Sequence, residues 1–279
     1  MDSLKPFLKW PGGKRWLVPY VRRIIGDQRF EDYFEPFVGG GAMFFAVRPW
    51  VAVISDINPD LINTYQQVKL HPRELVEKLQ ALPVSKEKYL ELRASRPTHP
   101  LEVAVRFLYL NRTAFGGMYR LNKKGQFNVP YGGGERTPEP LWTHNLLEDA
   151  ATALRNATIM VADFQDALGT AHERSLVYCD PTYTTAHNNN GFIRYNEENF
   201  SWADQKRLAR VCTEAAERGA TVLVSNAYHA EVRDLYPAAE VHTVYRWDGL
   251  CPTPSKRRAV REYLLVLRPL RAASCTCGY

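Results

Sequence analysis

The chain has 279 residues, 45% of them hydrophobic, with a net charge of +6 and a pI near 9.0. This is enough apolar material for one large α/β domain, alone or with a smaller inserted domain. The basic excess permits a nucleic-acid partner without requiring one. No segment approaches the roughly 18 apolar residues of a membrane span. The five cysteines form neither a disulfide framework nor a zinc-site spacing.

The N-terminal region carries charges at Lys5, Lys9 and Lys14 that interrupt every apolar stretch. We therefore expect no secretion signal. Reduced thiols in a cytoplasmic protein follow as the expectation for the cysteines.

The first third of the chain alternates short helices and strands. A basic, aromatic and glycine-bearing segment at 5–16 precedes a predicted helix over Leu17–Ile25. A strand from Asp32 runs into a glycine run at 39–41, and a helix is predicted over 42–47. Residues 51–56 predict a second strand, which ends in an acid. Asn58-Pro59 then opens a helix, with proline early, where its missing N–H costs little.

The middle of the chain changes character. Residues 72–109 are mostly helical in pattern, whereas 111–145 are rich in Gly, Asn, Arg and aromatics. We interpret 111–145 as a hairpin or loop-rich insertion. A helix from about Trp142 to Leu154 and a strand over 157–161 follow.

The last third predicts strands at 175–179 and 221–225, with a helix over 202–218 that Gly219 ends. Residues 187–199 are polar and suit a mobile loop. Residues 241–247 and 262–267 predict antiparallel strands joined by a basic loop at 254–258. The alternation predicts a mostly parallel sheet with helices on both faces and an antiparallel addition.

Ligands of such sheets bind outside the carboxyl ends of the strands. Three strand ends here carry suitable residues: the glycine run, Asp56 for ribose hydroxyls, and Asp163-Phe164 for a purine. The glycines match neither a dinucleotide fingerprint nor a Walker A loop. A nucleoside-like cofactor without phosphates fits better, although a glycine run can also be only a tight turn.

A fourth strand end carries Asp180-Pro181-Thr182-Tyr183. The acid can accept a hydrogen bond from an amino group, the proline carbonyl can accept another, and the tyrosine offers a face for stacking. Together they can hold a planar base by its exocyclic amine. Taken alone, four such residues are more often an ordinary turn.

Taken together, the motifs resemble one family. Segments 7–14, 35–41, 55–58, 163–164 and 180–183 occur in the order seen in Dam-like DNA adenine-N6 methyltransferases, the alpha-ordered group or D12 class. The resemblance runs from about Phe7 to Leu267. Thr182 departs from it, because the family usually has a second proline there. Both acceptors are kept, so we interpret Thr182 as a tolerated variant.

The resemblance implies a Rossmann-like methyltransferase fold. That fold has a mostly parallel seven-stranded sheet, an antiparallel end strand, helices on both faces and an inserted helical and hairpin DNA-recognition domain. The implied catalytic domain comprises 1–62 and 146–279. The implied target-recognition domain comprises 63–145, with the DNA-reading hairpin near 111–136.

The implied cofactor is S-adenosylmethionine, which becomes S-adenosylhomocysteine. The implied cofactor-binding residues are Trp10, Lys14, Glu35, Phe37, Gly39, Gly41, Asp56, Asp163, Phe164 and Asp180. The alternative for Trp10 is a packed aromatic, and for Lys14 a solvated surface charge.

The implied catalytic residues are Asp180, Pro181 and Tyr183. Hydrogen bonds from N6 to Asp180 and to the Pro181 carbonyl would localise the amine lone pair for direct methyl transfer. Tyr183 would stack on a base flipped out of the duplex. No covalent intermediate is needed, so Cys179 is expected to be a buried apolar residue.

DNA reading is assigned to the hairpin. The implied DNA-binding residues are Arg112, Phe115, Met118, Arg120, Asn122, Lys123, Asn128 and Pro130. Phe115 occupies a position that can insert between bases, and Arg120 one that reads guanine through O6 and N7. Further candidate phosphate contacts are Lys124, Arg136 and residues 256–258. For each charged residue a solvated surface position is an equal alternative.

The expected function is methylation of adenine N6 within a short specific sequence of double-stranded DNA. A catalytically impaired DNA-binding regulator and an RNA or cytosine-N4 methyltransferase are the alternatives. The expected partner is duplex DNA, bound by a monomer or homodimer, with no metal and no membrane. We expect a bacterial or phage-encoded cytoplasmic enzyme at the nucleoid that serves epigenetic regulation or restriction-modification. The target sequence and any restriction partner stay open.

Overall fold

The structure is a computed structural model that describes residues 4–269 except 11, 123, 135, 185–199 and 248–258. Several predictions therefore lie outside the described residues. They concern Lys123, the polar segment 187–199, the basic loop 254–258, and the cysteines at 251, 275 and 277.

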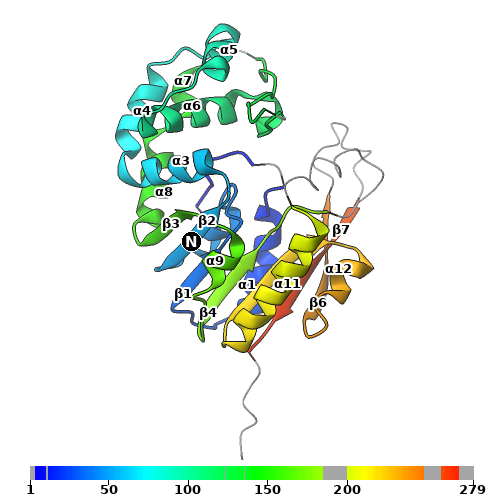
Figure 1. The fold of residues 1–279 in the computed structure, drawn as a ribbon. Coiled ribbons are helices and arrows are strands. Elements are labelled where there is room, and N and C mark those ends of the chain that lie inside the picture. Colours follow the sequence, from blue (N-terminus) through cyan, green and yellow to red (C-terminus); the bar gives the residue numbers. More distant parts are fainter. Residues whose placement is uncertain are drawn as a thin grey trace, which may run out of the picture. The chain divides into compact units, whose positions relative to one another are not determined.

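The strands of the described residues form one seven-stranded sheet in the order β3-β2-β1-β4-β5-β7-β6 (Figure 1). The pairs β2/β3, β1/β4 and β4/β5 are parallel, whereas β7 is antiparallel to both β5 and β6. This confirms the predicted mostly parallel sheet with an antiparallel addition. The antiparallel strand is β7, which lies between β5 and β6, so that the strand at the edge of the sheet is β6. The strands are β1 (Asp32–Glu35), β2 (Ala52–Asp56), β3 (Ala157–Val161), β4 (Ser175–Cys179), β5 (Thr221–Ala227), β6 (Glu240–Trp247) and β7 (Ala259–Leu267).

Helices separate most of the strands, as the alternating pattern predicts. Short 3-10 turns open α1 and follow α6; they are η1 (Arg15–Leu17) and η2 (Phe115–Gly117). The α-helices are α1 (Val18–Ile25), α2 (Ala42–Val47), α3 (Pro59–Leu70), α4 (Pro72–Gln80), α5 (Lys86–Ala94), α6 (Pro100–Thr113), α7 (Pro138–Leu141), α8 (His144–Leu154), α9 (Phe164–Leu168), α11 (Trp202–Glu217) and α12 (Ala230–Asp234).

Packing divides the chain into two compact units. The first comprises the chain up to Ile24 together with Val38–Ala162, and the second comprises Ile25–Phe37 together with the chain from Asp163 on. The sequence-based division into 1–62 with 146–279, and 63–145, concerns which residues handle the cofactor and which read DNA. Packing does not test that division, so it stays a prediction.

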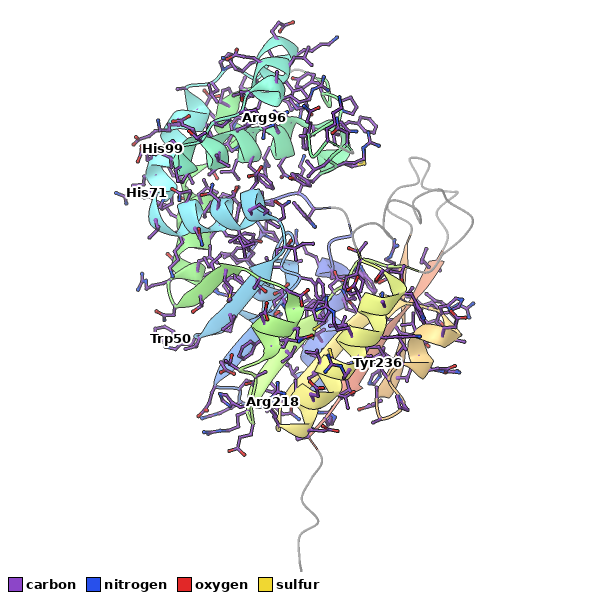
Figure 2. All side chains as sticks on the ribbon, viewed as in Figure 1. Trp50, His71, Arg96, His99, Arg218 and Tyr236 are labelled. Carbon is purple, nitrogen blue, oxygen red and sulfur yellow. The ribbon has the colours of Figure 1, made fainter. Side chains whose placement is uncertain are left out.

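In the second unit, β4 is buried at every residue, as expected of a strand paired in parallel on both sides. Helix α11 packs on β5 and α9. Gly219 ends this helix at φ +105°, and a Cβ there would lie 2.6 Å from Cβ of Glu173. Arg218, labelled in Figure 2, donates to the carbonyls of Leu168 at 2.8 Å and Ala171 at 2.9 Å. These bonds tie the end of α11 to the segment after α9.

In the first unit, α3 begins as its sequence predicts. The Asn58 side chain accepts hydrogen bonds from the N–H groups of Asp60 at 3.1 Å and Leu61 at 3.2 Å, and Pro59 fills the first helical position. Helix α3 packs against α6 and α8. Four of its apolar side chains are fully buried, namely Leu61, Ile62, Tyr65 and Val68.

The predicted insertion at 111–145 needs correction at both ends. Helix α6 continues to Thr113, and the helix predicted from Trp142 begins at His144. Tertiary bonds explain the first difference. Buried Asn111 accepts from the Lys9 N–H at 2.9 Å and donates to the Lys9 carbonyl at 2.6 Å, which satisfies a polar side chain inside a helix.

Membrane crossing has no candidate among the helices of the described residues, since none of them combines sufficient length with sufficient apolar character.

Candidate active site

The glycine run of the first unit is a tight turn that opens α2. Gly39 and Gly41 have φ of +45° and +68°, where residues with a Cβ are strained. A Cβ on Gly39 would lie 2.7 Å from Nε1 of Trp10, and one on Gly40 would lie 2.7 Å from its Cβ. The hydroxyl of Tyr65 donates to the Gly39 carbonyl at 3.0 Å. The run therefore serves both as a turn and as a surface for the Trp10 ring.

Asp56 at the end of β2 is locked onto this turn. Its carboxylate accepts the Gly39 N–H at 3.2 Å and the Asn58 N–H at 3.0 Å. Burial raises the pKa of Asp56, and the backbone N–H donors partly oppose that rise. A half-buried, oriented carboxylate at a strand end suits ribose hydroxyls, as predicted for this position.

The two predicted cofactor residues of the N-terminal segment are both packed. The Trp10 ring stacks on Tyr119, with centroids 5.3 Å apart, and on Phe107 at 6.4 Å. Lys14 is only 6% exposed, and its ammonium donates to the Gly12 carbonyl at 3.1 Å. A solvated surface charge is therefore excluded for Lys14.

The second unit holds the other predicted cofactor residues, among them the aromatic pair Phe37 and Phe164. The Phe164 ring stacks on Phe37 with centroids 5.6 Å apart, and the Arg207 guanidinium lies 4.1 Å from the ring centroid. Glu35, at the end of β1, is buried and accepts from the Tyr33 hydroxyl at 2.6 Å. Phe37 and Arg207 thus pack against the buried Phe164 ring, and its contact with a purine stays a prediction.

Asp163 caps α9 and pairs with Arg207. Its two carboxylate oxygens lie 2.6 and 2.9 Å from the guanidinium nitrogens, and one also accepts the Gln165 N–H. Burial tends to raise the pKa of Asp163, but the hydrogen bonds and charge of Arg207 outweigh it, so the pKa lies below its usual value. No sequence motif predicted Arg207, because it lies on a different helix.

The catalytic candidate Asp180 is oriented from β5. Its Oδ1 accepts the Ser225 hydroxyl at 2.7 Å, and Ser225 lies 3.1 Å from the Tyr178 hydroxyl. Ser225 has one hydroxyl proton, which it uses in the hydrogen bond to the Asp180 carboxylate. The hydrogen bond between Tyr178 and Ser225 must therefore be donated by the Tyr178 hydroxyl. The chain of donors fixes the rotation of the Asp180 carboxylate.

The rest of the tetrapeptide is also held. The Asn226 amide donates to Gln205 at 3.0 Å, and Gln205 donates to the Thr182 carbonyl at 3.4 Å. The Thr182 side chain is exposed, whereas Pro181 is buried. Ser225 and Asn226 lie at the carboxyl end of a predicted strand, so the strand-end rule was the signal that could have found them.

The predicted hairpin forms, and in its described residues isolated bridges pair the two arms. Leu121 pairs with Phe127 and Ala114 with Tyr131, both antiparallel. The Asn122 side chain accepts the N–H groups of Lys124 and Gln126 and so closes the turn. Asn122 therefore has a structural role, while its contact with DNA stays a prediction.

The exposed side of the hairpin carries Arg120 and Phe115. Arg120 donates through Nε to the Asn128 side chain at 2.8 Å, and Phe115 is 58% exposed. The Pro130 carbonyl accepts the Phe115 N–H at 2.9 Å, and Met118 is half-buried. The guanidinium of Arg112 donates to the Leu141 carbonyl at 2.9 Å.

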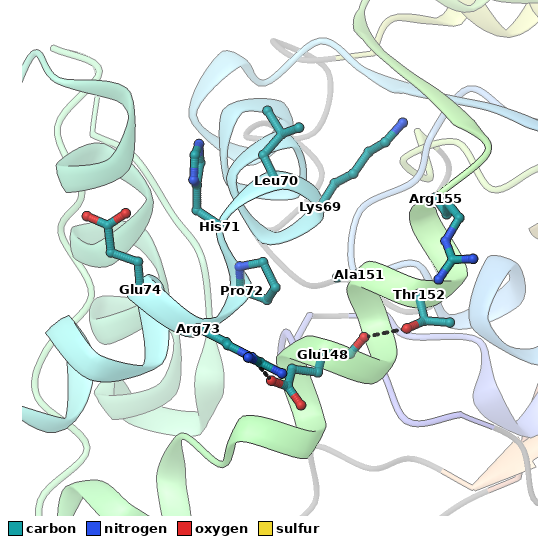
Figure 3. A pocket seen from close by; sticks show the side chains of 10 residues that line it. All are labelled: Lys69, Leu70, His71, Pro72, Arg73, Glu74, Glu148, Ala151, Thr152 and Arg155. Atoms are coloured by element: carbon teal, nitrogen blue, oxygen red, sulfur yellow. Dashed lines mark hydrogen bonds and ion pairs between the residues drawn. The ribbon is translucent and has the colours of Figure 1, made fainter.

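A surface hollow of about 660 Å³ lies elsewhere in the first unit (Figure 3). Residues of α3, α4 and α8 line it, including an Arg73–Glu148 ion pair at 2.6 Å. It sits at the far end of α3 from Asn58, about 18 Å along a helix of this length. None of the predicted site residues lines this hollow.

Comparison with known proteins agrees with these motifs. The family model for D12 class N6 adenine-specific DNA methyltransferases matches residues 10–247. This chain belongs to that family. The match to this family model includes residues of both units, from Trp10 to the end of β6.

The relatives cover nearly the whole chain. A type II methyltransferase, M1.LlaDCHI of Lactococcus lactis subsp. cremoris, is 38% identical over 87% of this chain and 88% of its own. The DNA adenine methylase of Vibrio cholerae is 33% identical over 96% of this chain and 98% of its own length. The DNA adenine methylase of Escherichia coli K12 is 32% identical over 96% of this chain and 97% of its own length.

Family membership confirms the predicted class of reaction, methylation of adenine N6 in DNA. Metal chemistry has no candidate centre in the described part of the chain, where no group of three or more His, Cys, Asp or Glu side chains is placed to hold an ion. The roles of individual site residues stay predictions.

Proposed function

We propose that this chain methylates N6 of adenine within a short specific sequence of double-stranded DNA, with S-adenosylmethionine as donor (EC 2.1.1.72). The observation that carries the proposal is the oriented Asp180 carboxylate, held by Ser225 beside Pro181 and Tyr183. Residues 180–183 directly follow the end of β4, and the chain belongs to a family whose reaction is adenine-N6 methylation.

The residues of each unit fit the proposed cofactor. In the first, Trp10, Lys14, Gly39, Gly41 and Asp56 offer a close backbone surface and a ribose-binding carboxylate. Those of the second unit are Glu35, Phe37, Asp163, Phe164 and Asp180. When bound, S-adenosylmethionine supplies an electrophilic methyl group.

Asp180 and the Pro181 carbonyl perform the chemistry by accepting hydrogen bonds from the target amine. The N6 lone pair is delocalised into the purine ring, which makes it a poor nucleophile. Two acceptors draw the amine toward tetrahedral geometry and localise that lone pair for direct transfer. Alignment is then the main contribution to rate. Tyr183 stacks on the base, which must leave the duplex to reach it.

The hairpin reads the sequence under this proposal. Arg120 contacts guanine and Phe115 inserts between bases. Further contacts with DNA are assigned to Met118, Asn122, Asn128 and Pro130. Arg112, Lys123 and Lys124 contact phosphate. We place this bacterial or phage-encoded enzyme in the cytoplasm at the nucleoid, where it acts on duplex DNA as a monomer or homodimer.

We expect Asp180→Asn to slow methylation severely without unfolding the protein. An amide offers N6 one fewer acceptor and a competing donor, so we expect transfer to fall about a hundredfold or more. Labelled S-adenosylmethionine with unmethylated plasmid DNA measures the rate, and calorimetry measures whether cofactor affinity falls far less.

Sequencing of DNA from cells that express the chain tests the modified base and the site together. We expect N6-methyladenine at one short sequence, strongly reduced with Asp180→Asn. Modified cytosine in place of adenine would contradict the proposal, as would the absence of methylation from a chain that still binds DNA. Transfer of label to RNA in the assay with labelled S-adenosylmethionine would favour an RNA methyltransferase instead.

A further inference from the structure

The second unit contains a buried carboxylate that the reaction above does not use. Glu262 on β7 is 1% exposed. Its Oε1 accepts from Nε of Arg246 on β6 at 2.5 Å, and its Oε2 accepts from the Tyr183 hydroxyl at 2.6 Å. The two oxygens thus join a guanidinium on an edge strand to the tyrosine predicted to stack on the target base.

Burial of a carboxylate is costly unless the charge is paired and its oxygens accept hydrogen bonds. Arg246 satisfies the charge, and its side chain is itself 30% exposed. Arg246 donates to Oε1 alone in this ion pair, so Oε2 needs a second donor, and the Tyr183 hydroxyl supplies it. The phenol occupies that oxygen with a short bond to a charged acceptor, which is among the stronger hydrogen bonds in proteins.

The bond also crosses the sheet. Tyr183 follows β4, and β5 lies between β4 and β7 in the strand order. Glu262 is in register with Ala227 of β5, the last residue of that strand. The segment that carries Asp180 is thereby fastened at one end by Ser225 of β5 and at the other by Glu262 of β7.

We propose that Glu262 is a positioning residue for the target base, because it fixes the tyrosine ring against which the adenine stacks. The inference rests on the proposed function, in which Tyr183 is the stacking residue. A ring held at its hydroxyl keeps one plane and one tilt, so the amine of a stacked base reaches Asp180 in one orientation. Burial and the Glu262 charge raise the pKa of Tyr183, so the phenol keeps the proton that it donates.

The test is a cycle of Glu262→Gln, Tyr183→Phe and the double variant. Glutamine keeps the shape but cannot accept at both ends, and phenylalanine keeps the ring without the hydroxyl. We expect Glu262→Gln to lower kcat roughly ten- to hundredfold, the size of a hydrogen bond to a charged group, with KM for plasmid DNA within about twofold. In the Tyr183→Phe background the same change should have no further effect on kcat.

Glu240→Gln is the matched control, since Glu240 lies on the neighbouring strand β6 and its ion pairs are exposed. It should leave kcat unchanged. An unchanged kcat in Glu262→Gln, or an equal loss in both tyrosine backgrounds, would overturn the proposal.

A second measurement needs no methyl transfer and so separates this inference from the proposed function. With 3-fluorotyrosine at position 183, fluorine magnetic resonance follows the phenol titration directly. Replacing Glu262 by Gln should lower that pKa, because the neighbouring charge is lost. An identical titration in both proteins would show that Glu262 does not hold the ring, whether or not the enzyme methylates DNA.

Discussion

At the residue scale, the site depends on side chains that hold other side chains. A carboxylate such as that of Asp180 can accept hydrogen bonds in any extended segment. Here the Ser225 hydroxyl orients it, and the hydrogen bond from Tyr178 fixes the direction of the Ser225 proton. Both hydroxyls are buried on central strands. The reacting group therefore inherits the rigidity of the sheet.

Ser225→Ala should reduce methyl transfer while leaving the fold intact. The change removes one hydrogen bond to a carboxylate, which corresponds to about a tenfold loss in kcat. Burial and the Asp180 charge raise the pKa of Tyr178 well above its usual value, so the tyrosine stays protonated and remains a hydrogen-bond donor in this variant. Steady-state kinetics measure the loss.

The control for this variant is the melting temperature together with calorimetric cofactor affinity. A loss of kcat matched by a large fall in either would show that Ser225 supports the fold rather than the orientation of Asp180.

At the element scale, the hairpin that follows α6 is specified by its turn. The Asn122 side chain accepts the N–H groups of Lys124 and Gln126 at the tip, and buried Phe127 and Val129 anchor the returning segment. The exposed side chains Arg120 and Phe115 do not form part of this core. Arg120 forms a hydrogen bond with the Asn128 side chain. That bond uses Nε of Arg120 and so restricts the direction of the guanidinium.

Arg120→Ala should relax the target sequence with little change in cofactor affinity. Loss of a bidentate contact to guanine lowers discrimination at one base by about 1–3 kcal/mol. Methylated-DNA sequencing of cells expressing the variant measures it. Asn128→Ala is the companion variant, and we expect a smaller relaxation at the same base, since the guanidinium keeps its donors but loses its orientation.

Unchanged discrimination at every base of the site in Arg120→Ala would contradict the assignment of sequence reading to this residue.

At the scale of the whole molecule, stability should depend on pH through the pair of Asp163 and Arg207. The pKa of Asp163 lies below its usual value of 3.8, so the folded state favours the charged carboxylate. The stabilisation is fully present above that usual value and is lost as the pH falls through the lower folded pKa. Both side chains are 34% exposed, so solvent screens the pair and its contribution is about 1 kcal/mol or less.

Arg207→Ala should therefore lower the free energy of unfolding at pH 7 more than at pH 3. Urea unfolding of the cofactor-free protein at several pH values measures the difference. Lys206→Ala, one residue earlier on the exposed side of α11, is the control and should show no such dependence. A constant difference across this range would mean that Arg207 stabilises the fold by packing on Phe164 rather than through Asp163.

By itself, the sequence determined the element order, the mostly parallel sheet with its antiparallel addition, and the family. These features follow from local periodicity, helix caps and turn residues, which depend only on residues close together in the sequence. Asn58-Pro59 at the start of α3 and Gly219 after α11 are examples. It also placed Asp56, Asp163 and Asp180 at strand ends. The end of α6 was misplaced, because the Lys9 backbone that stabilises Asn111 is distant in sequence.

Only the tertiary structure decided which side chains orient these acids. Arg207 reaches Asp163 across 44 positions, Ser225 reaches Asp180 across 45, and Glu262 reaches Tyr183 across 79. No local pattern encodes such pairs, because each arises where separate helices and strands meet in space. The sequence named the groups that react, and the fold determines how firmly each is held.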